Sequence, residues 1–414
     1  MEAVGCSSEM LLSCNADEIA QMPKLPSIPP RYWINRNKLL DLSMSIIPNS
    51  RPAMKALVLN ALGRGFDFED VDIAAPMGRE VLVNVQASGL CHTDLLFATH
   101  DIAPTPSVLG HEVAGIVAAV GPDVTQAHVG DHVVGSLAQA CGSCARCLSG
   151  RPFQCQHPES TLRRPDDPPR LSRTGRGLFQ GFGLGGFAKQ ALIHENQLAV
   201  IPKEMPFAQA ALLGCGVVTG AGAVLNTANV RAGDSVVVFG AGGVGLNAVS
   251  GARLAGASRI VVIDIQQKRL DAARRFGATD LIDSTKSKPV EAVRDLLPGG
   301  ADHVFDFVGL KLVAEEGLAM LGVGGGLYLV GVSKPDVDIS LNIFGAIGGQ
   351  KRVLGVNFGS TNAKRDIPMY AHLYLQGRMN LDDLVSKEIS LREVNDGYAS
   401  LKDGSLNRVV VTSF

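Results

Sequence analysis

The sequence has almost no excess of charge, because 38 Lys and Arg residues stand against 40 Asp and Glu residues in a chain of 414. Balanced charge removes the electrostatic reason to expect nucleic acid or an anionic membrane as a partner, and we expect neither. Aromatic residues are also few, at 5 %, with a single Trp. The hydrophobic share of 46 % is enough for a sizeable core, and the length suggests about two to three domains.

Long uninterrupted apolar runs are also lacking. Residues 205–230, 235–252 and 317–333 carry no charge, but glycines and polar residues interrupt all of them, which favours buried core over a membrane span. The N-terminus has neither the pattern of a secretory signal nor the Arg-rich composition of a transit peptide, so we expect a cytoplasmic protein. Residues 1–53 are Pro-rich without clear periodicity, which predicts a flexible N-terminal extension.

Four cysteines are spaced as C-x2-C-x2-C-x7-C, at Cys141, Cys144, Cys147 and Cys155. Four thiolates on one tight loop are the ligands of a closed, structural zinc site. Disulfides are disfavoured because nothing indicates secretion. An iron–sulfur run would place its fourth Cys after three residues and before Pro, which this loop does not do. Chance placement of four cysteines at this spacing is the remaining alternative, and the pattern argues against it.

Three further potential ligands are dispersed along the chain. They are Cys91, His111 in the segment Leu-Gly-His-Glu-Val, and Cys215 in the segment Leu-Gly-Cys-Gly-Val. Taken singly, a lone Cys is more often a small core residue and a lone His more often a structural one. Together, two thiolates and an imidazole form the set that leaves the fourth position of zinc open for water or substrate. An open position indicates catalysis.

A glycine fingerprint for a dinucleotide follows an apolar, β-branched run at 235–239. Gly240, Gly242 and Gly245 form G-x-G-x-x-G, residues 246–255 have helical composition, and the next predicted strand ends in Asp264. The glycines allow a tight turn, close approach of the pyrophosphate and close packing of helix on strand, while the helix N-terminus favours the anion. The carboxylate of Asp264 would bind the ribose hydroxyls and repel a 2′-phosphate, which favours NAD over NADP.

Two basic residues and a series of regularly spaced apolar segments follow the fingerprint. The positive charges of Lys268 and Arg269 weaken the predicted preference for NAD over NADP. The alternative is that both side chains are ordinary solvated charges on a helix. Short apolar runs at 280–283, 303–309, 326–332 and 351–358 are spaced for right-handed crossovers and complete six strands of a doubly wound sheet. The segment 54–204 instead shows short alternating strands and turns, typical of a β-rich domain.

These motifs together resemble the zinc-dependent alcohol dehydrogenases of the medium-chain dehydrogenase/reductase family. Cys91-His-Thr-Asp, Gly110-His-Glu, the four-cysteine loop, Gly214-Cys-Gly-Val-Val-Thr-Gly and the nucleotide fingerprint occur in the family's order. The resemblance covers residues 54–414 and implies an α/β protein, with a GroES-like β-rich catalytic domain around a doubly wound Rossmann domain that has a six-stranded parallel sheet. The implied bounds are 1–53 for the extension, 54–216 and 358–414 for the catalytic domain, and 217–357 for the Rossmann NAD-binding domain.

The resemblance also implies a role for each site residue. Two zinc ions per subunit are expected, one catalytic and one structural, and the catalytic zinc would lower the pKa of the alcohol so that hydride can pass to NAD. Thr93 would relay the alcohol proton, and Asp94 would orient His111. The other implied contacts are Glu112 close to the catalytic zinc, and His92, Thr219, Gly243, Val244 and Arg408 at the cofactor.

One position departs from the family pattern. Leu96 stands where many members carry a second relay histidine, so proton release would run through the cofactor ribose and water, or through His100. Leu95, Phe97 and Leu137 also fall near expected substrate-lining positions. This apolar character favours a bulky aromatic, allylic or terpenoid primary alcohol over ethanol.

Three rival functions stay open at this point. A zinc-free quinone or enoyl reductase would lack the dispersed ligand set, and a non-catalytic zinc- and NAD-binding relative would bind NAD(H) without turnover. Oxidation of formaldehyde as its glutathione adduct is the third rival, although no anion-recognising cluster marks the expected pocket. We expect a small-molecule alcohol or aldehyde substrate and a homodimer or homotetramer, with the edge of the nucleotide sheet as a dimer seam.

Overall fold

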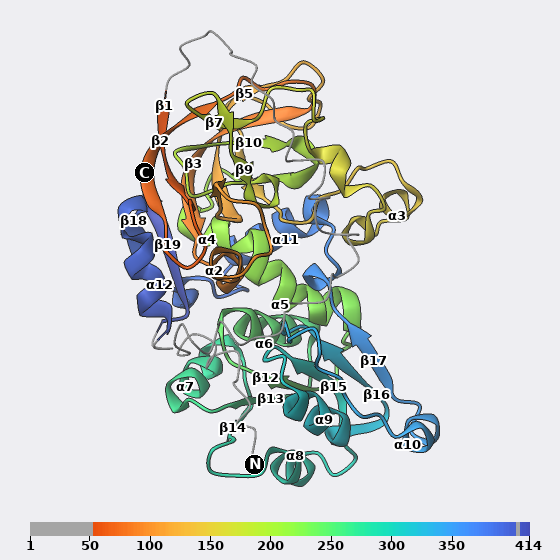
Figure 1. The fold of residues 1–414 in the computed structure, drawn as a ribbon. Coiled ribbons are helices and arrows are strands. Elements are labelled where there is room, and N and C mark those ends of the chain that lie inside the picture. The colour runs from red at the N-terminus through yellow and green to blue at the C-terminus, as the bar shows by residue number, and fades with distance from the viewer. Residues whose placement is uncertain (1–52, 403–405) are drawn as a thin grey trace. The chain divides into compact units, whose positions relative to one another are not determined.

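The computed structural model describes residues 53–402 and 406–414, so the predicted flexible extension lies outside the described residues apart from Ala53. The described chain forms two compact units. We call residues 219–360 the parallel-sheet unit, and residues 53–218 together with 361–414 the β-rich unit. The helices and strands of the two units are labelled in Figure 1.

The parallel-sheet unit contains a six-stranded sheet in the order β14-β13-β12-β15-β16-β17, with every pair parallel. The strand order reverses beside β12, as in a doubly wound dinucleotide fold. β12 is buried along its whole length, which explains its continuous apolar run. The prediction of six parallel strands is confirmed. The strands are β12 (Ser235–Phe239), β13 (Arg259–Asp264), β14 (Asp280–Asp283), β15 (Ala301–Asp306), β16 (Leu321–Leu329) and β17 (Arg352–Gly355).

Helices cover both faces of this sheet. α6 packs with α7 and α8 packs with α9, so that one pair covers each face (Figure 1). Alternate strand residues Val237, Phe239, Val261 and Ile263 face α8 and α9 in one buried cluster. The helices are α6 (Gly243–Ala255), α7 (Gln267–Phe276), α8 (Pro289–Leu296), α9 (Lys311–Met320) and α10 (Ile343–Gly348).

The β-rich unit is built on a seven-stranded sheet in the order β11-β6-β5-β3-β19-β18, with β10 also paired to β3. A four-stranded sheet, β1-β2-β7-β8, and the short pair β4-β9 complete it. The strands are β1 (Ala53–Val58), β2 (Asp67–Ile73), β3 (Glu80–Gly89), β4 (Ser107–Val108), β5 (Glu112–Val120), β6 (His132–Gly135), β7 (Leu171–Arg173), β8 (Arg176–Gly177), β9 (Phe179–Gln180), β10 (Gln190–His194), β11 (Leu198–Ile201), β18 (Val385–Ser390) and β19 (Arg408–Ser413).

The register of the central strands decides which residues meet. Gly89 at the end of β3 pairs with Glu112 of β5 on one side and with Val410 of β19 on the other. The C-terminal strand therefore lies next to a strand more than 300 residues earlier in the chain. A core of aromatic and aliphatic side chains packs there, with Phe66, Phe187 and Tyr398 in ring contact.

The helices of the β-rich unit have at most 13 residues, apart from a run that crosses the unit boundary. This run, Phe207–Ala228, is long and apolar enough to cross a membrane by length and composition, and 78 % of its most apolar window is buried within the structure. It is made of α4 (Phe207–Leu212), a π-helical segment (Leu213–Val217), α5 (Val218–Gly222) and a second π-helical segment (Ala223–Ala228). The other helices are α2 (His92–Thr99), α3 (Ala145–Leu148), α11 (Ala363–Leu375) and α12 (Val394–Lys402).

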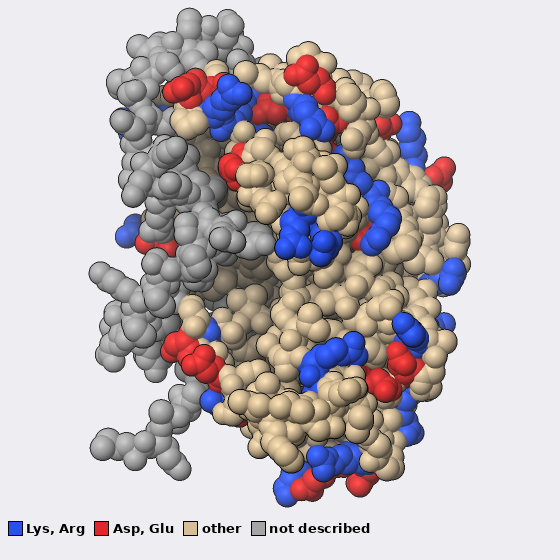
Figure 2. Space-filling model, turned by 90° about the vertical axis from the view of Figure 1, so that its right-hand side faces the viewer, with Lys and Arg blue, Asp and Glu red and all other residues tan. Residues whose placement is uncertain are grey.

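Surface charges are interspersed on the face shown in Figure 2. Lys and Arg side chains alternate with Asp and Glu across the described part of this face, with uncharged surface between them. The described residues on this face therefore present charges of both signs.

Candidate metal and nucleotide sites

The β-rich unit brings the dispersed ligand residues together. Ligand atoms of Cys91, His111, Glu112 and Cys215 all lie within 4.8 Å of one another. Cys91 is the N-cap of α2 directly after β3, and His111 immediately precedes β5. Cys215 lies in a π-helical segment, a local widening of the helix that is frequent at functional sites.

Two glycines allow the helix of Cys215 to approach its neighbours. A Cβ at Gly214 would lie 2.2 Å from the carbonyl oxygen of Gly135, and a Cβ at Gly216 would lie 2.8 Å from Nη2 of Arg408. Nε2 of His111 is 3.3 Å from Sγ of Cys215. Zinc ligands at about 2.0–2.3 Å from the metal stand roughly 3.5 Å apart around a tetrahedron. The donor set therefore fits a zinc ion.

Asp94 fixes the orientation of His111. Its Oδ2 lies 2.8 Å from Nδ1 of His111, and its Oδ1 accepts from the backbone N–H of Gly110 at 3.0 Å. Asp94 and His111 are both fully buried. Burial alone would lower the pKa of His111, but Asp94 and the sulfur of Cys91 raise it well above its ordinary value. A carboxylate on Nδ1 leaves Nε2 as the atom that faces the sulfurs, which is the tautomer a metal needs.

The two sulfurs of the set are unequal. A hydrogen bond from Cys215, the largest influence, holds the pKa of Cys91 well below its ordinary value, and the same bond with burial raises the pKa of Cys215 well above its own. A thiolate is the form that binds metal. A divalent ion would favour thiolate at both sulfurs.

Glu112 and Arg408 form a buried pair beside the sulfurs. Nη2 of Arg408 lies 3.8 Å from Oε1 of Glu112, and neither oxygen of Glu112 has a hydrogen-bond partner within the described structure. Burial raises the pKa of Glu112 to about 7, although Arg408 acts in the opposite direction. The structure thus places Arg408, expected at the cofactor pyrophosphate, against the metal ligands and only 5 % exposed.

Thr93 and Phe182 border the ligand set. Oγ1 of Thr93 is 3.7 Å from Sγ of Cys91, and the side chain is half-buried. The ring of Phe182 meets the ring of His111 edge-on at 5.0 Å, and its backbone has a φ of +55° between two glycines. Phe97, expected near the substrate, packs on Phe182 at 4.8 Å and is buried. Leu137 is buried as well.

The four-cysteine loop gathers as its spacing predicts. Ligand atoms of Cys141, Cys144, Cys147 and Cys155 lie within 4.8 Å of one another, and Sγ of Cys141 is 3.9 Å from Sγ of Cys147. Six cysteines are free among the described residues, so no disulfide competes there. Backbone N–H groups point at the sulfurs, and those of Gln156 and Cys147 lower the pKa of Cys144 to about 6. Donors around clustered thiolates fit a closed zinc site.

The nucleotide fingerprint forms the expected strand, turn and helix. Gly240 has a φ of +89°, and a Cβ at Gly245 would lie 1.8 Å from the carbonyl oxygen of Gly240. Gly242 is the N-cap of α6, and a Cβ there would meet nothing within 4 Å. The turn therefore requires glycine at two positions, while the third leaves open space where backbone can meet a phosphate.

Asp264 ends β13, and both of its oxygens accept hydrogen bonds from backbone. Ala241 donates to Oδ2 at 2.7 Å and Gln266 donates to Oδ1 at 2.9 Å. The carboxylate thus ties the glycine turn to the second strand. Its remaining lone pairs can accept from hydroxyl groups of a ribose.

The remaining predicted cofactor residues are spread over both units. Thr219 in α5 and Val244 in α6 lie on helices in close contact, because a Cβ at Gly220 would be 2.1 Å from the carbonyl oxygen of Val244. Gly243 is the first residue of α6, and Arg269 lies in α7. His92 is exposed at the start of α2.

Comparisons with known proteins agree with this geometry. Residues 78–203 match the family described as alcohol dehydrogenase GroES-like domain, and residues 243–375 match zinc-binding dehydrogenase. An NDMA-dependent alcohol dehydrogenase from Amycolatopsis methanolica is 36 % identical over 364 residues, which covers 86 % of this chain and 98 % of the relative. The chain belongs to the zinc-dependent alcohol dehydrogenase family.

Other members of the alcohol dehydrogenase family are as similar. S-(hydroxymethyl)glutathione dehydrogenase from Escherichia coli is 37 % identical over 365 residues, which covers 86 % of this chain and 99 % of the relative. The crystal structure of benzyl alcohol dehydrogenase from Acinetobacter calcoaceticus has a TM-score of 0.83 at 34 % identity and covers 88 % of this chain and 100 % of its own.

Sequence reasoning missed two contacts in this member of the alcohol dehydrogenase family. The hydroxyl of Tyr398, from α12, donates to the carbonyl oxygen of Cys91 at 3.3 Å and so supports the turn that carries the first ligand. Phe182 reaches His111 from a glycine-rich loop. No local pattern marks Tyr398, whereas the glycines on either side of Phe182 signal an unusual backbone.

Proposed function

We propose that the protein oxidises a bulky primary alcohol, aromatic, allylic or terpenoid, to the aldehyde with NAD as hydride acceptor. The observation that carries this proposal is the buried set of Cys91, His111 and Cys215 with Asp94 behind the imidazole. Two thiolates and one imidazole hold a zinc ion with a position left for substrate. Zinc at such a site acts as a Lewis acid that lowers the pKa of an alcohol, and NAD supplies the hydride chemistry.

The side chains of the chain would position substrate and move its proton. Thr93, half-buried beside Cys91, has a hydroxyl that can accept the alcohol proton and donate its own onward. Asp94 keeps Nδ1 of His111 protonated, so that Nε2 remains a ligand. Leu96 offers no proton relay, so we propose that the proton leaves through cofactor and water.

The aromatic character beside His111 supports the choice of a bulky alcohol. The half-buried ring of Phe182 contacts the imidazole of His111 edge-on, and Leu96 makes the neighbouring helix α2 more apolar. Aromatic substrates gain from ring contacts of this kind. The relative named benzyl alcohol dehydrogenase supports the same choice, and the relative named S-(hydroxymethyl)glutathione dehydrogenase supports the adduct of formaldehyde as the second candidate.

The experiment compares zinc content and turnover. We expect two zinc ions per subunit and NAD-dependent turnover of benzyl alcohol or geraniol above ethanol and hydroxymethylglutathione. Cys215→Ala is expected to keep one zinc and lose activity, while the matched variant Cys144→Ala loses the other zinc. No turnover of any alcohol, with zinc at the open site intact, would refute the proposed activity, and turnover of hydroxymethylglutathione alone would select the second candidate.

We also propose that the protein is a cytoplasmic homodimer joined along β17. Among the described residues this edge strand is paired on one side only, and its residues are exposed. Beside it in the chain, α10 exposes Ile343, Phe344 and Ile347, the last two at 89 % and 72 %. Unpaired strand edges with exposed apolar side chains pair readily with a second copy. Sedimentation of wild type as a monomer, identical to Phe344→Asp, would refute this assembly.

A further inference from the structure

The side chains of the neighbouring residues Arg79 and Glu80 bind groups at opposite ends of the four-cysteine loop. Nε of Arg79 donates to Oε1 of Glu195 at 2.6 Å, and its Nη2 donates to Oδ1 of Asn196 at 3.0 Å. Nδ2 of Asn196 in turn donates to the carbonyl oxygen of Ala140 at 2.9 Å. Ala140 immediately precedes the first cysteine, so Arg79 holds the start of the loop through one intermediary.

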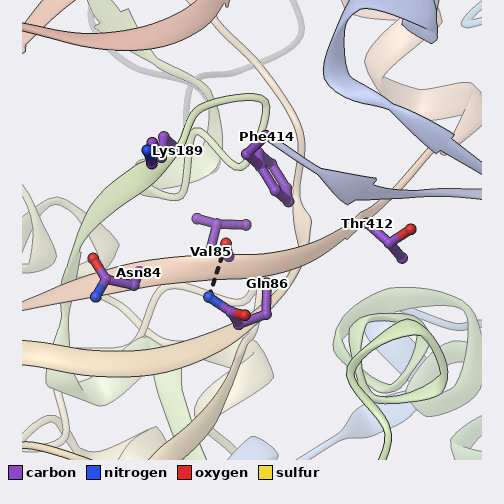
Figure 3. Close-up of a pocket in the computed structure, with 6 residues that line it drawn as sticks. All are labelled: Asn84, Val85, Gln86, Lys189, Thr412 and Phe414. Atoms are coloured by element: carbon purple, nitrogen blue, oxygen red, sulfur yellow. Dashed lines mark hydrogen bonds between the residues drawn. The ribbon is translucent and has the colours of Figure 1, made fainter.

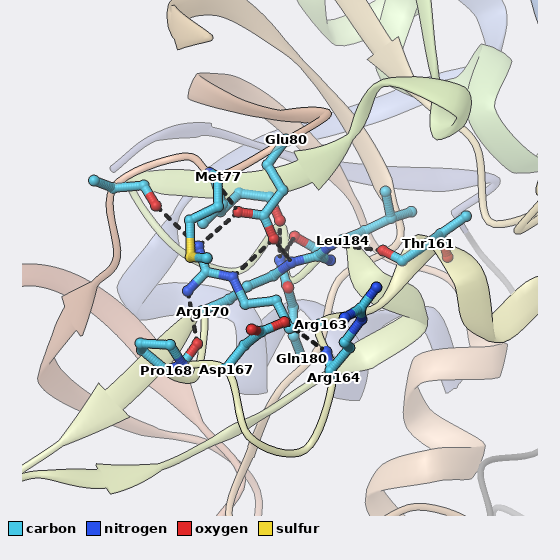
Figure 4. A network of polar contacts seen from close by, with 12 residues as sticks. Met77, Glu80, Thr161, Arg163, Arg164, Asp167, Pro168, Arg170, Gln180 and Leu184 are labelled. Carbon is cyan, nitrogen blue, oxygen red and sulfur yellow. Dashed lines mark hydrogen bonds and ion pairs between the residues drawn. The ribbon is translucent and has the colours of Figure 1, made fainter. Parts of the chain in front are cut away.

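Glu80 holds the far end of the loop through two arginines (Figure 4). Oε1 of Glu80 accepts from Nε of Arg170 at 2.7 Å, and Oε2 accepts from Nη2 of Arg163 at 2.6 Å. Nη2 of Arg170 donates to the carbonyl oxygen of Thr161 at 2.5 Å. Thr161 follows shortly after the fourth cysteine. Arg163 further donates to the carbonyl oxygens of Ala75 and Pro168.

These charges are held away from water. The side chains of Glu80, Arg163 and Arg170 are 5 %, 9 % and 7 % exposed. Burial alone would raise the pKa of Glu80, but Arg163 and Arg170 lower it below its ordinary value. Removal of one partner from a buried ion pair leaves the other charge uncompensated. Separation of these charged side chains therefore requires a large free energy.

The loop itself has little core of its own. α3 (Ala145–Leu148), which lies inside it, has no buried residue, and Leu148 is 75 % exposed. Of the four cysteines only Cys155 is buried. Hydrophobic packing therefore does not set the shape of the loop, and that shape depends on its metal and on the points where its ends are fixed.

We propose that Arg79-Glu80 is a clamp that holds both ends of the cysteine loop together, so that the four thiolates stay gathered and release metal slowly. Arg79 and Glu80 are positioning residues, because they touch neither sulfur nor metal. They act through Asn196 on one side and through Arg170 on the other. The clamp rests on the proposed closed zinc site.

Protection of individual cysteines tests the clamp in the zinc-loaded enzyme. With EDTA present, alkylation by iodoacetamide is followed at each cysteine by mass spectrometry in wild type and Glu80→Gln. Loss of a direct hydrogen-bond partner of a metal ligand typically costs about 10- to 100-fold in metal affinity, and because Glu80 acts through an intermediary we expect the lower end of this range. We expect alkylation of the four loop cysteines to accelerate by roughly tenfold at least, while Cys91 and Cys215 keep wild-type rates.

A second variant and a matched control separate the clamp from general instability. Asn196→Ala removes the other anchor without leaving a buried charge, and we expect the same selective acceleration. Asp70→Asn breaks an exposed ion pair with Lys55, at 2.7 Å in the same unit, and is expected to change no rate. Wild-type rates at the loop in both anchor variants, or equal acceleration at Cys91 and Cys215, would overturn the clamp.

Alkylation of zinc-loaded wild type with and without EDTA separates failure of the clamp from failure of the zinc site. If wild type binds zinc but its loop cysteines react equally fast with and without EDTA, no metal protects the loop. That result overturns the closed zinc site, and the clamp with it. If EDTA accelerates alkylation in wild type and the two anchor variants behave identically to it, only the clamp is overturned.

Discussion

Replacement of Asp94 by Asn should weaken zinc binding at the open site without emptying the closed one. The change keeps the shape of the side chain and removes only its charge and one acceptor. Asp94 uses one oxygen for Nδ1 of His111, at 2.8 Å, and the other for the N–H of Gly110, at 3.0 Å. An amide has one oxygen, so Asn cannot accept both hydrogen bonds.

Either orientation of the amide is unfavourable. With its oxygen on Nδ1 of His111, the amide N–H₂ faces the N–H of Gly110, donor against donor. With its nitrogen on Nδ1, the imidazole proton must move to Nε2, the atom that lies 3.3 Å from Sγ of Cys215 and would face the metal. A buried donor left without its acceptor costs about 1–3 kcal/mol. This cost corresponds to roughly tenfold to a hundredfold in the dissociation constant for zinc.

The assay is competition between metal-free protein and a chelating dye of known affinity. Cys215→Ala supplies the isotherm of the closed site alone, and the difference from wild type isolates the open site. Asp306→Asn is the matched control, because Asp306 is also buried but accepts from the backbone N–H groups of Val308 and Gly309 and lies in the other unit. A dissociation constant for Asp94→Asn within twofold of wild type would refute this account of the imidazole.

Three further predictions concern other parts of the molecule. Gly245→Ala should abolish NAD binding measured by calorimetry, because the new Cβ would lie 1.8 Å from a carbonyl oxygen of the turn, whereas Gly299→Ala, whose Cβ would meet nothing within 4 Å and whose φ is not positive, should leave the affinity nearly unchanged. Asp264→Ser should shift the ratio of kcat/KM for NAD and NADP towards NADP by about tenfold, since it removes the charge that repels a 2′-phosphate; an unchanged ratio would contradict this role. Burial, together with the charges of Arg79 and Arg170, lowers the pKa of His194 from its ordinary 6.5 to about 4. As pH falls, the unfolded chain therefore binds the proton before the folded chain does. The free energy of unfolding decreases as pH falls from about 6.5 to about 4. His194→Gln should show a shallower loss of urea midpoint between pH 7 and pH 5, and parallel curves would argue against this contribution.

The fold was predictable where local pattern and physical requirement coincide. A buried β-branched run, a glycine turn and an acid at the end of the next strand led to β12, α6 and β13, and the spacing of apolar runs led to the other strands. The closed cysteine set was predictable for the same reason, because its ligands are neighbours in the chain. The dispersed set was a weaker prediction, since Cys91 and Cys215 are weak signals when taken singly and only their combination with His111 indicated an open site.

Contacts between distant segments were not predictable from local pattern. The hydroxyl of Tyr398 reaches the backbone of Cys91 from the end of the chain. Arg408 pairs with Glu112, whereas the family pattern suggested only a phosphate contact. The contact of Phe97 with Phe182 likewise joins two segments that are far apart in the sequence. Such pairings depend on sheet register and helix docking.

The register of three strands is the property on which the open site depends most. Cys91 follows β3, Glu112 begins β5, and Arg408 begins β19, and the pairing of Gly89 with Glu112 brings the first two together. A Cβ at Gly89 would lie 2.1 Å from Oε2 of Glu112, so the carboxylate occupies the space that a side chain on the neighbouring strand would fill. A slip of one residue would turn Glu112 to the opposite face and leave Arg408 buried without its partner. The charged pair therefore penalises wrong registers of the strands that carry the metal ligands.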